Sequence, residues 1–245
     1  MKVAVFADGS VGLRIVEFLA REYLQDLAAV ITRDVNDISR VAERQGVVTL
    51  VAESDERVID QLKTYRVELG ILAWWPRIIR EPLLSSLPVG FINTHPSLLP
   101  FNRGKHYNFW ALVEQAPFGA SIHFVDDGID TGDVIAQLPI AYNWTDTGGT
   151  LYHKAQSGMV QLFEESYPHI RSGNYTRHTQ DLGQGSHHTA DELDHASHID
   201  LSRHYSAREL LNLLRARTFA DYPGCWFEED GQRFEITVSI ERRGQ

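Results

Sequence analysis

Short apolar runs alternate with amphipathic segments along the first ninety residues. The runs that are apolar enough to be buried strands are Lys2 to Ala7, Leu27 to Thr32, Val47 to Val51, Val67 to Ala73 and Val89 to Ile92. Between them, apolar residues recur at helical spacing over Leu13 to Ala20, Ile38 to Gln45 and Asp55 to Thr64, the last preceded by a Ser54 cap. Strands and helices that alternate at this spacing predict an α/β fold with a mainly parallel, helix-covered sheet.

The second half of the chain changes its pattern twice. Ala120 to Val125 and Val134 to Ile140 read as paired strands, and Thr147 caps a long helix from Leu151 to His169. A polar, histidine-rich segment follows. Beyond it, Ser206 to Glu209 resembles a capping box, and the runs Cys225 to Glu228 and Arg233 to Ile240 predict a β-hairpin. We therefore expect a catalytic domain over 1–172, a polar linker over 173–199 and a small C-terminal α+β subdomain over 200–245.

Composition narrows the possible functions. The formal net charge of −10 argues against non-specific nucleic-acid binding, because phosphate backbones are engaged by clustered Lys and Arg. Cys225 is the only cysteine, so neither an intramolecular disulfide nor a thiolate zinc site can form. Signal-like and membrane-spanning apolar runs are not found, so we expect a cytoplasmic protein without a membrane partner.

The candidate chemistry lies between Gly90 and Gln137. Asn93 and His95 stand where the strand ending at Ile92 should give way to a loop, and Asp130 lies in an acidic turn threaded by Gly128 and Gly132. An amide can donate to an oxyanion, an imidazole can move a proton, and a carboxylate can orient the imidazole. The alternative interpretation is ordinary loop hydrogen bonding beside a solvated hairpin.

The full motif is more specific than its parts. Asn93-x-His-Pro-Ser-Leu-Leu-Pro, then Arg103-Gly104, then His123-Phe-Val-x-x-x-Ile-Asp-Thr-Gly-Asp, resembles the folate-dependent formyltransferases. The resemblance implies a Rossmann-like formyltransferase domain, 10-formyltetrahydrofolate as co-substrate, no metal, and Asn93, His95 and Asp130 as catalytic residues. Asp-Thr-Gly also occurs in aspartic proteases, but those need two copies and this chain has one.

The resemblance also implies binding residues. Those expected to contact the folate are Arg77, Ile78, Ile79, Val125, Asp126 and Asp127. Those expected to contact the amine substrate are Gly9, Ser10, Arg103, Gly104, Lys105 and Tyr107. The glycine turn at Gly9 can instead serve only to pack helix on strand. Family members commonly have Pro-x-x-Trp where this chain reads His106 to Trp110, a departure that can bear on which amine is accepted.

A second motif concerns the acceptor. Arg215-Ala-Arg-Thr-Phe with Tyr222-Pro-Gly resembles the C-terminal segment of nucleotide-sugar N-formyltransferases. It implies formylation of a nucleotide-linked, first of all dTDP-linked, 4-amino- or 3-amino-dideoxy sugar for surface polysaccharide (O-antigen) synthesis, by a homodimer. A different amine acceptor, or hydrolysis of the same folate, stays open; the hydrolases usually begin with a regulatory domain, whereas this sequence starts at the first strand of the sheet.

The histidine-rich segment raises the question of a metal. His178, His187, His188, His195 and His198 are potential ligands, but their spacing matches no zinc pattern. Their neighbours are Asp, Glu, Ser and Thr in linker proportions. We therefore expect a solvated crossing segment.

Overall fold

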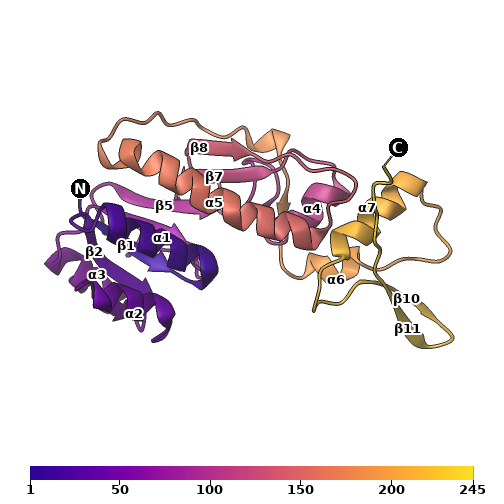
Figure 1. The fold of residues 1–245 in the computed structure, drawn as a ribbon, viewed down its shortest axis with the longest axis horizontal. Coiled ribbons are helices and arrows are strands. Elements are labelled where there is room, and N and C mark those ends of the chain that lie inside the picture. The colour runs from indigo at the N-terminus through magenta and orange to yellow at the C-terminus, as the bar shows by residue number, and fades with distance from the viewer. Residues whose placement is uncertain (245) are drawn as a thin grey trace. The chain divides into compact units, whose positions relative to one another are not determined.

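The computed structural model describes residues 1–244, which form two compact units. The first unit contains residues 1–95, 120–138 and 156–180, and the second contains 96–119, 139–155 and the chain from 181 onward. The first unit is built from β1 (Val3–Ala7), α1 (Gly9–Glu22), β2 (Leu27–Thr32), α2 (Asp37–Arg44), β3 (Val48–Val51), α3 (Asp55–Thr64), β4 (Leu69–Ala73), β5 (Gly90–His95), β7 (Gly119–Phe124), β8 (Val134–Pro139) and most of α5 (Gly148–Arg171) (Figure 1).

A seven-stranded sheet in the order β3-β2-β1-β4-β5-β7-β8 forms the centre of the first unit. Neighbouring strands pair in parallel from β3 through β2, β1 and β4 to β5. β7 is antiparallel to β5. The predicted mainly parallel, helix-covered sheet is confirmed. Chain order reverses between β1 and β4, so the carboxyl ends of these two strands border the crevice where such sheets bind ligands. β5 is the next strand along.

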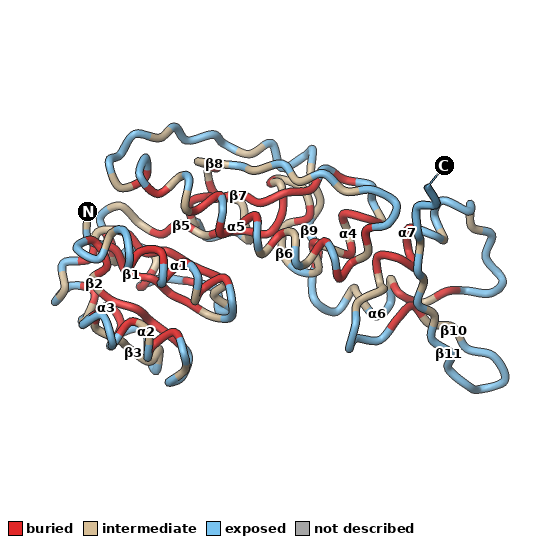
Figure 2. The backbone as a smooth tube through the Cα atoms, viewed as in Figure 1, coloured by how far each residue is buried: buried red, intermediate tan, exposed pale blue. Residues whose placement is uncertain are grey.

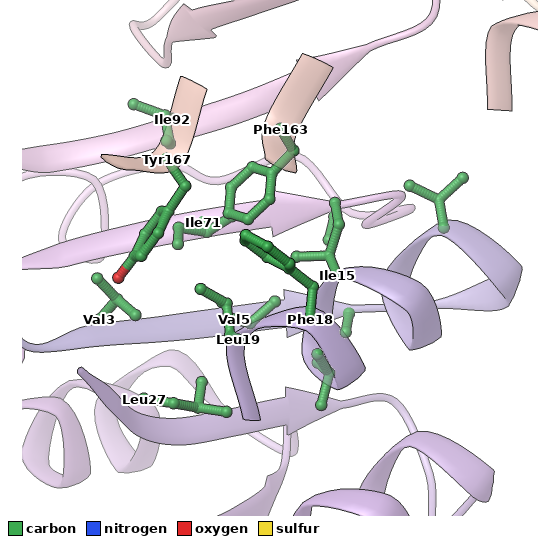
Figure 3. Packing of buried hydrophobic residues seen from close by; sticks show 14 of the residues in the cluster. Val3, Val5, Ile15, Phe18, Leu19, Leu27, Ile71, Ile92, Phe163 and Tyr167 are labelled. Atoms are coloured by element: carbon green, nitrogen blue, oxygen red, sulfur yellow. The ribbon is translucent and has the colours of Figure 1, made fainter. Parts of the chain in front are cut away.

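Alternation along the strands divides the core between the two faces of the sheet. Val3 and Val5 of β1 pack with side chains of α1 and α5, including Phe18 and Phe163 (Figure 3). Phe6 packs on the opposite face of the sheet with residues of α3. β1 is buried on both faces, as a central parallel strand should be (Figure 2). Each large side chain so buried contributes roughly 1.5–3 kcal/mol, so these layers hold the sheet edge that carries the candidate chemistry.

A buried carboxylate anchors the end of α5 in the first unit. Asp26 accepts hydrogen bonds from the Tyr167 hydroxyl at 3.1 Å and from Arg171 Nε at 2.7 Å. Burial alone would raise the pKa of Asp26, but the hydrogen bonds from Arg171 and Tyr167 outweigh it and lower that pKa. Burial beside Asp26 raises the pKa of Tyr167 well above its ordinary value.

The second unit contains short elements. They are β6 (Arg103–Gly104), α4 (Tyr107–Val113), η1 (Leu182–Gln184), β9 (His187–His188), α6 (Glu192–Ala196), α7 (Ala207–Arg217), β10 (Cys225–Glu229) and β11 (Gln232–Ile236). β10 and β11 form the predicted hairpin, and positive φ at Asp230 and Gly231 makes its tight turn. Ser206 caps α7 by accepting from the Glu209 amide at 3.1 Å.

The histidine-rich segment is more ordered than its composition suggests. It contains η1, β9 and α6, and His188 within it is buried. Paired charges, described below, make this burial possible. Across residues 1–244, no helix combines the length and the apolar character that crossing a membrane requires.

Candidate active site

Antiparallel pairing of β5 and β7 places the candidate residues. Asn93 stands opposite His123, and His95 stands opposite Ser121. Because side chains two apart share a face of a strand, all four lie on one face of the sheet. The strand therefore continues through His95 instead of ending at Ile92 as expected, since β7 supplies partners as far as that residue. His95 is 4% exposed, so it is largely enclosed by protein.

The acidic turn after β7 is shaped by its glycines. A Cβ on Gly132 would lie 2.0 Å from the Phe124 carbonyl oxygen, so only glycine fits there. Asp130 has φ of 54°, a left-handed conformation that is uncommon outside glycine and is found at functional sites. Gln180 Nε2 donates to the carbonyls of Asp130 and Gly132, at 3.0 and 2.7 Å, and braces the turn.

The turn returns the Asp130 carboxylate to both imidazoles. Asp130 Oδ1 lies 3.4 Å from His95 Nδ1 and 3.6 Å from His123 Nε2, with side-chain exposures of 15%, 5% and 3% for Asp130, His95 and His123. His123 Nε2 is also 3.2 Å from Asn93 Nδ2. The structure thus brings Asn93, His95 and Asp130 together within the first unit, in a nearly dry site where electrostatic interactions are strong.

The same atoms could in principle hold a cation. His95, His123 and Asp130 have ligand atoms within 4.8 Å of one another, and no other such group occurs among residues 1–244. Two imidazoles and a carboxylate suit a transition metal. However, His123 Nε2 faces the Asn93 amide nitrogen, which can only donate, so its lone pair is already engaged. The arrangement favours proton chemistry over ligation.

The residues predicted to contact folate come from two adjoining segments of the first unit. Ile79 is buried in the core while Ile78 is 60% exposed, and the Arg77 guanidinium donates to the Ala52 carbonyl at 2.8 Å. The Arg80 side chain donates to the Asp127 carbonyl, which joins the segment after β4 to the acidic turn.

The turn segment offers mainly its backbone. The Val125 amide donates to the Phe91 carbonyl at 2.8 Å. Asp126 accepts from the Gly128 amide at 3.1 Å and from the Thr131 hydroxyl at 2.7 Å, so its carboxylate shapes the turn. Backbone groups at 77–79 and 125–127 therefore stay the predicted contacts of a flat heterocycle.

Gly9 and Ser10 lie at the exposed start of α1, beside the crevice between β1 and β4. The Asp8 carboxylate caps this helix by accepting from the Gly9 amide at 3.0 Å and pairs with Arg33 at 3.1 Å. A Cβ on Gly9 would lie 3.1 Å from Trp74 Cδ1. Contact with the amine substrate stays a prediction.

The remaining predicted acceptor residues belong to the second unit. Arg103 and Gly104 pair in parallel with His187 and His188, and Gly104 has φ of 85° with its Cβ position 2.3 Å from the His188 carbonyl oxygen. Lys105 is exposed. Tyr107 is buried, which raises the pKa of its hydroxyl well above the ordinary value. Arg103 Nε, Tyr107 OH and Trp110 Nε1 are buried donors with no hydrogen-bond partner in the part of the chain described.

His188 is the centre of a second histidine cluster. Its ring stacks on Trp110 with centroids 3.7 Å apart and planes 7° apart. Nε2 lies 2.8 Å from Glu114 Oε1, and Nδ1 lies 2.9 Å from Glu192 Oε2. Carboxylates only accept, so with both ionised the ring is an imidazolium over an indole. These contacts explain its burial.

Sequence reasoning did not single out two residues of the first-unit site. His123 could have been found, because the alternation of Ala120 to Val125 places Ser121 and His123 on one face. Gln180 carries no signal, because its role depends on where a distant polar segment returns to the turn.

Comparison with known proteins identifies relatives over most of the chain. A family model described as Formyl transferase matches residues 1–165, and one described as N-formyltransferase dimerization C-terminal domain matches residues 192–242. The dTDP-4-amino-4,6-dideoxyglucose formyltransferase of Mycobacterium tuberculosis is 28% identical over 151 residues, 61% of this chain and 64% of the relative. The chain thus spans less than two thirds of that relative's length.

Solved structures give the same picture. A sugar N-formyltransferase from a Shewanella species has a TM-score of 0.83 at 20% identity, covering 100% of this chain and 99% of that chain. This likeness shows the fold. The formyltransferase PseJ from Anoxybacillus kamchatkensis, solved with UDP-4,6-dideoxy-4-formamido-L-AltNAc and tetrahydrofolate, is 28% identical with a TM-score of 0.61, covering 80% and 89% of the two chains.

Proposed function

Because this chain belongs to the formyl transferase family, we propose that it transfers a formyl group from 10-formyltetrahydrofolate to an amino group of a nucleotide-linked amino sugar. The observation that carries the proposal is the Asn93, His95 and Asp130 cluster. It joins a donor for an oxyanion to a proton carrier and a carboxylate, with Asp130 Oδ1 3.4 Å from His95 Nδ1.

The acceptor class rests on the second unit and on the relatives. The matched C-terminal domain and the nucleotide sugars named for the M. tuberculosis enzyme and PseJ support a dideoxy amino sugar with its amine at C4. An amine at C3 is the second form of this proposal. dTDP is our first choice of carrier, and surface polysaccharide (O-antigen) synthesis our proposed use of the product. Several buried donors of the described residues have no hydrogen-bond partner, and those on Arg103, Tyr107 and Trp110 support a polar ligand in this unit.

In the proposed mechanism the neutral amine attacks the formyl carbon. A C–N bond forms, the carbonyl oxygen becomes negative, and Asn93 Nδ2–H donates to it. His95 assists that oxygen or relays a proton, and Asp130 orients His95 and accepts the proton lost by the attacking nitrogen. The bond between carbon and N10 then breaks, N10 takes up a proton, and tetrahydrofolate leaves. Backbone groups of 77–79 and 125–127 hold the pterin.

The test is formyl transfer to a panel of dTDP-, UDP- and GDP-linked 3-amino and 4-amino sugars, with each sugar nucleotide weighed by mass spectrometry. A gain of one formyl group on a panel member, with stoichiometric tetrahydrofolate, supports the proposal. Tetrahydrofolate released without any acceptor identifies a hydrolase instead. Asp130→Ala should flatten the pH profile of transfer; an unchanged profile contradicts the role given to Asp130.

We also propose a homodimer built through the C-terminal domain. The support is the match of residues 192–242 to a dimerization domain, together with the exposed aromatic residues Tyr222 and Phe234. Light scattering on the full chain should give twice the 27.8 kDa monomer mass. A monomer at micromolar concentration contradicts this part.

A further inference from the structure

We infer that His123 is a positioning residue that sets the orientation of the Asn93 carboxamide, and so aims an amide N–H at the reacting oxygen. The inference rests on the proposed function, in which Asn93 stabilises the oxyanion, and adds a residue to it. His123 is 2% exposed and lies directly across the strand pair from Asn93.

The backbone fixes which ring nitrogen of His123 carries the proton. Nδ1 lies 2.8 Å from the carbonyl oxygen of Phe124. A carbonyl oxygen only accepts, so Nδ1 must carry the hydrogen. The ring is buried, which leaves no water to compete for this bond. In the neutral imidazole, Nε2 then keeps its lone pair.

The lone pair on His123 Nε2 fixes the orientation of the Asn93 side-chain amide. Nδ2 of Asn93 lies 3.2 Å from Nε2 of His123 and can only donate. One of its two N–H bonds is used here, which leaves the second for another acceptor and turns the amide oxygen away from the histidine. Direct cross-strand pairing holds the two Cβ atoms at a fixed short separation, so the side chains stay within reach.

The carboxylate of Asp130 is a more distant neighbour of His123 Nε2 than the amide of Asn93, which lies at 3.2 Å. Asp130 Oδ1 lies 3.6 Å from His123 Nε2 but 3.4 Å from His95 Nδ1, and the longer separation exceeds hydrogen-bonding distance. A proton on Nε2 would turn that atom toward Asp130 and end its bond with Asn93. The neutral His123 ring is therefore the form that orients Asn93. Its hydrogen bond to the Phe124 carbonyl fixes the ring, and the ring in turn fixes the Asn93 amide.

Two substitutions separate positioning from packing. Glutamine reaches as far as Nε2 and can accept from Asn93, whereas asparagine reaches only as far as Nδ1. We expect His123→Asn to lower kcat about tenfold, part of the roughly 10²–10³ carried by an oxyanion donor, with KM for both substrates unchanged. His123→Gln should keep kcat within about threefold of wild type. A tenfold loss of kcat in a folded His123→Gln protein, or a wild-type kcat in His123→Asn, would overturn the role given to His123. The proposed formyl transfer would still stand.

A double-mutant cycle tests the route through Asn93. If His123 acts only by orienting that amide, adding His123→Asn to Asn93→Ala costs nothing further in kcat. Losses that multiply overturn the inference. Near-normal turnover in Asn93→Ala overturns the proposed function first and the inference with it.

A direct readout needs no activity. Nitrogen-15 NMR of the imidazoles, with the His123 signal assigned by its loss in His123→Gln, should show the neutral Nδ1–H tautomer at neutral pH. The Nε2–H tautomer or an imidazolium overturns the inference whether or not the protein transfers formyl groups.

Discussion

Two histidine–carboxylate clusters in this chain differ in the distances between their polar atoms. In the second unit, His188 lies 2.8 and 2.9 Å from two carboxylates and stacks on Trp110. In the first unit, His95 and His123 lie 3.4 and 3.6 Å from one carboxylate, Asp130. Typical hydrogen bonds of this kind span about 2.7–3.2 Å. Both distances of the His188 cluster lie within this range, and both distances from Asp130 Oδ1 to the imidazoles lie beyond it.

The difference indicates different roles. A histidine that bonds two carboxylates has no nitrogen left for a substrate, so His188 can only join segments of the chain. The looser first-unit cluster, on a turn with a left-handed Asp130, suits a site whose hydrogen bonds tighten when reactants bind. Histidine and carboxylate in proximity are therefore a poor guide to catalysis until distances are known.

The largest expected effect is a loss of turnover when residues of the first-unit cluster are replaced. Asn93→Ala and His95→Ala should each lower kcat roughly a hundredfold or more, because oxyanion and proton-transfer assistance are lost. The exposed residues Asn174 and His169 provide matched controls, since Asn174→Ala and His169→Ala remove the same side-chain types elsewhere in the first unit. Steady-state transfer assays check this; two site variants as active as the controls would refute the mechanism.

A second effect concerns the turn that carries Asp130. Gly132→Ala would force a Cβ to within 2.0 Å of the Phe124 carbonyl oxygen, so the turn must shift and carry the carboxylate away from His95. We expect at least about a tenfold loss of kcat, since small misplacements in active sites are costly. Gly183→Ala is the control, because its nearest atom would lie at 3.4 Å. Equal activity of the two variants would show that the turn tolerates movement.

The third prediction concerns the His188 cluster. His188→Leu leaves Glu114 and Glu192 without their shared partner and should lower the free energy of unfolding by about 2 kcal/mol, or Tm by about 4–8 °C. Because His188 has no atom free for substrate, kcat measured well below Tm should change less than about twofold. Thermal unfolding and transfer assays on one preparation check both statements. A large fall in kcat with unchanged Tm would make this cluster catalytic.

The smallest effect is a pH dependence. The hydrogen bond from His188, followed by those from the Thr189 amide and hydroxyl, lowers the pKa of Glu192 from 4.5 to about 2. A carboxyl that binds its proton less tightly when folded stabilises the protein fully above pH 4.5, and this contribution is lost as the pH falls through about 2. The difference in Tm between wild type and Glu192→Gln should therefore shrink across this window. A constant difference would contradict the pairing.

The sequence predicted those parts of the molecule that depend on local patterns. Apolar runs located β1 to β4, and Ser54 and Asp55 located the start of α3, because burial and capping act within a few residues. The proximity of Asn93, His95 and Asp130 could be predicted because each half of their motif is a short continuous stretch of sequence, whereas their catalytic role stays a prediction.

The features that the sequence did not predict depend on contacts between residues far apart in the chain. The strand end after His95 is set by β7, and the role of His123 by its pairing with Asn93 thirty residues earlier. His188 looked solvent-exposed by composition, yet Glu114, 74 positions away, neutralises it. Local hydrophobicity carries no information on such pairs, because each polar residue is buried only through its partner.

The antiparallel register of β5 and β7 has a consequence for turnover. Because β5 is also held in register by β4, a slip of one residue between β5 and β7 would turn Ser121 and His123 of β7 to the opposite face of the sheet, away from Asn93 and His95. Most backbone hydrogen bonds would survive such a slip, whereas the constellation would be gone. Turnover therefore depends on one alignment between two strands, which the number of backbone hydrogen bonds alone does not fix.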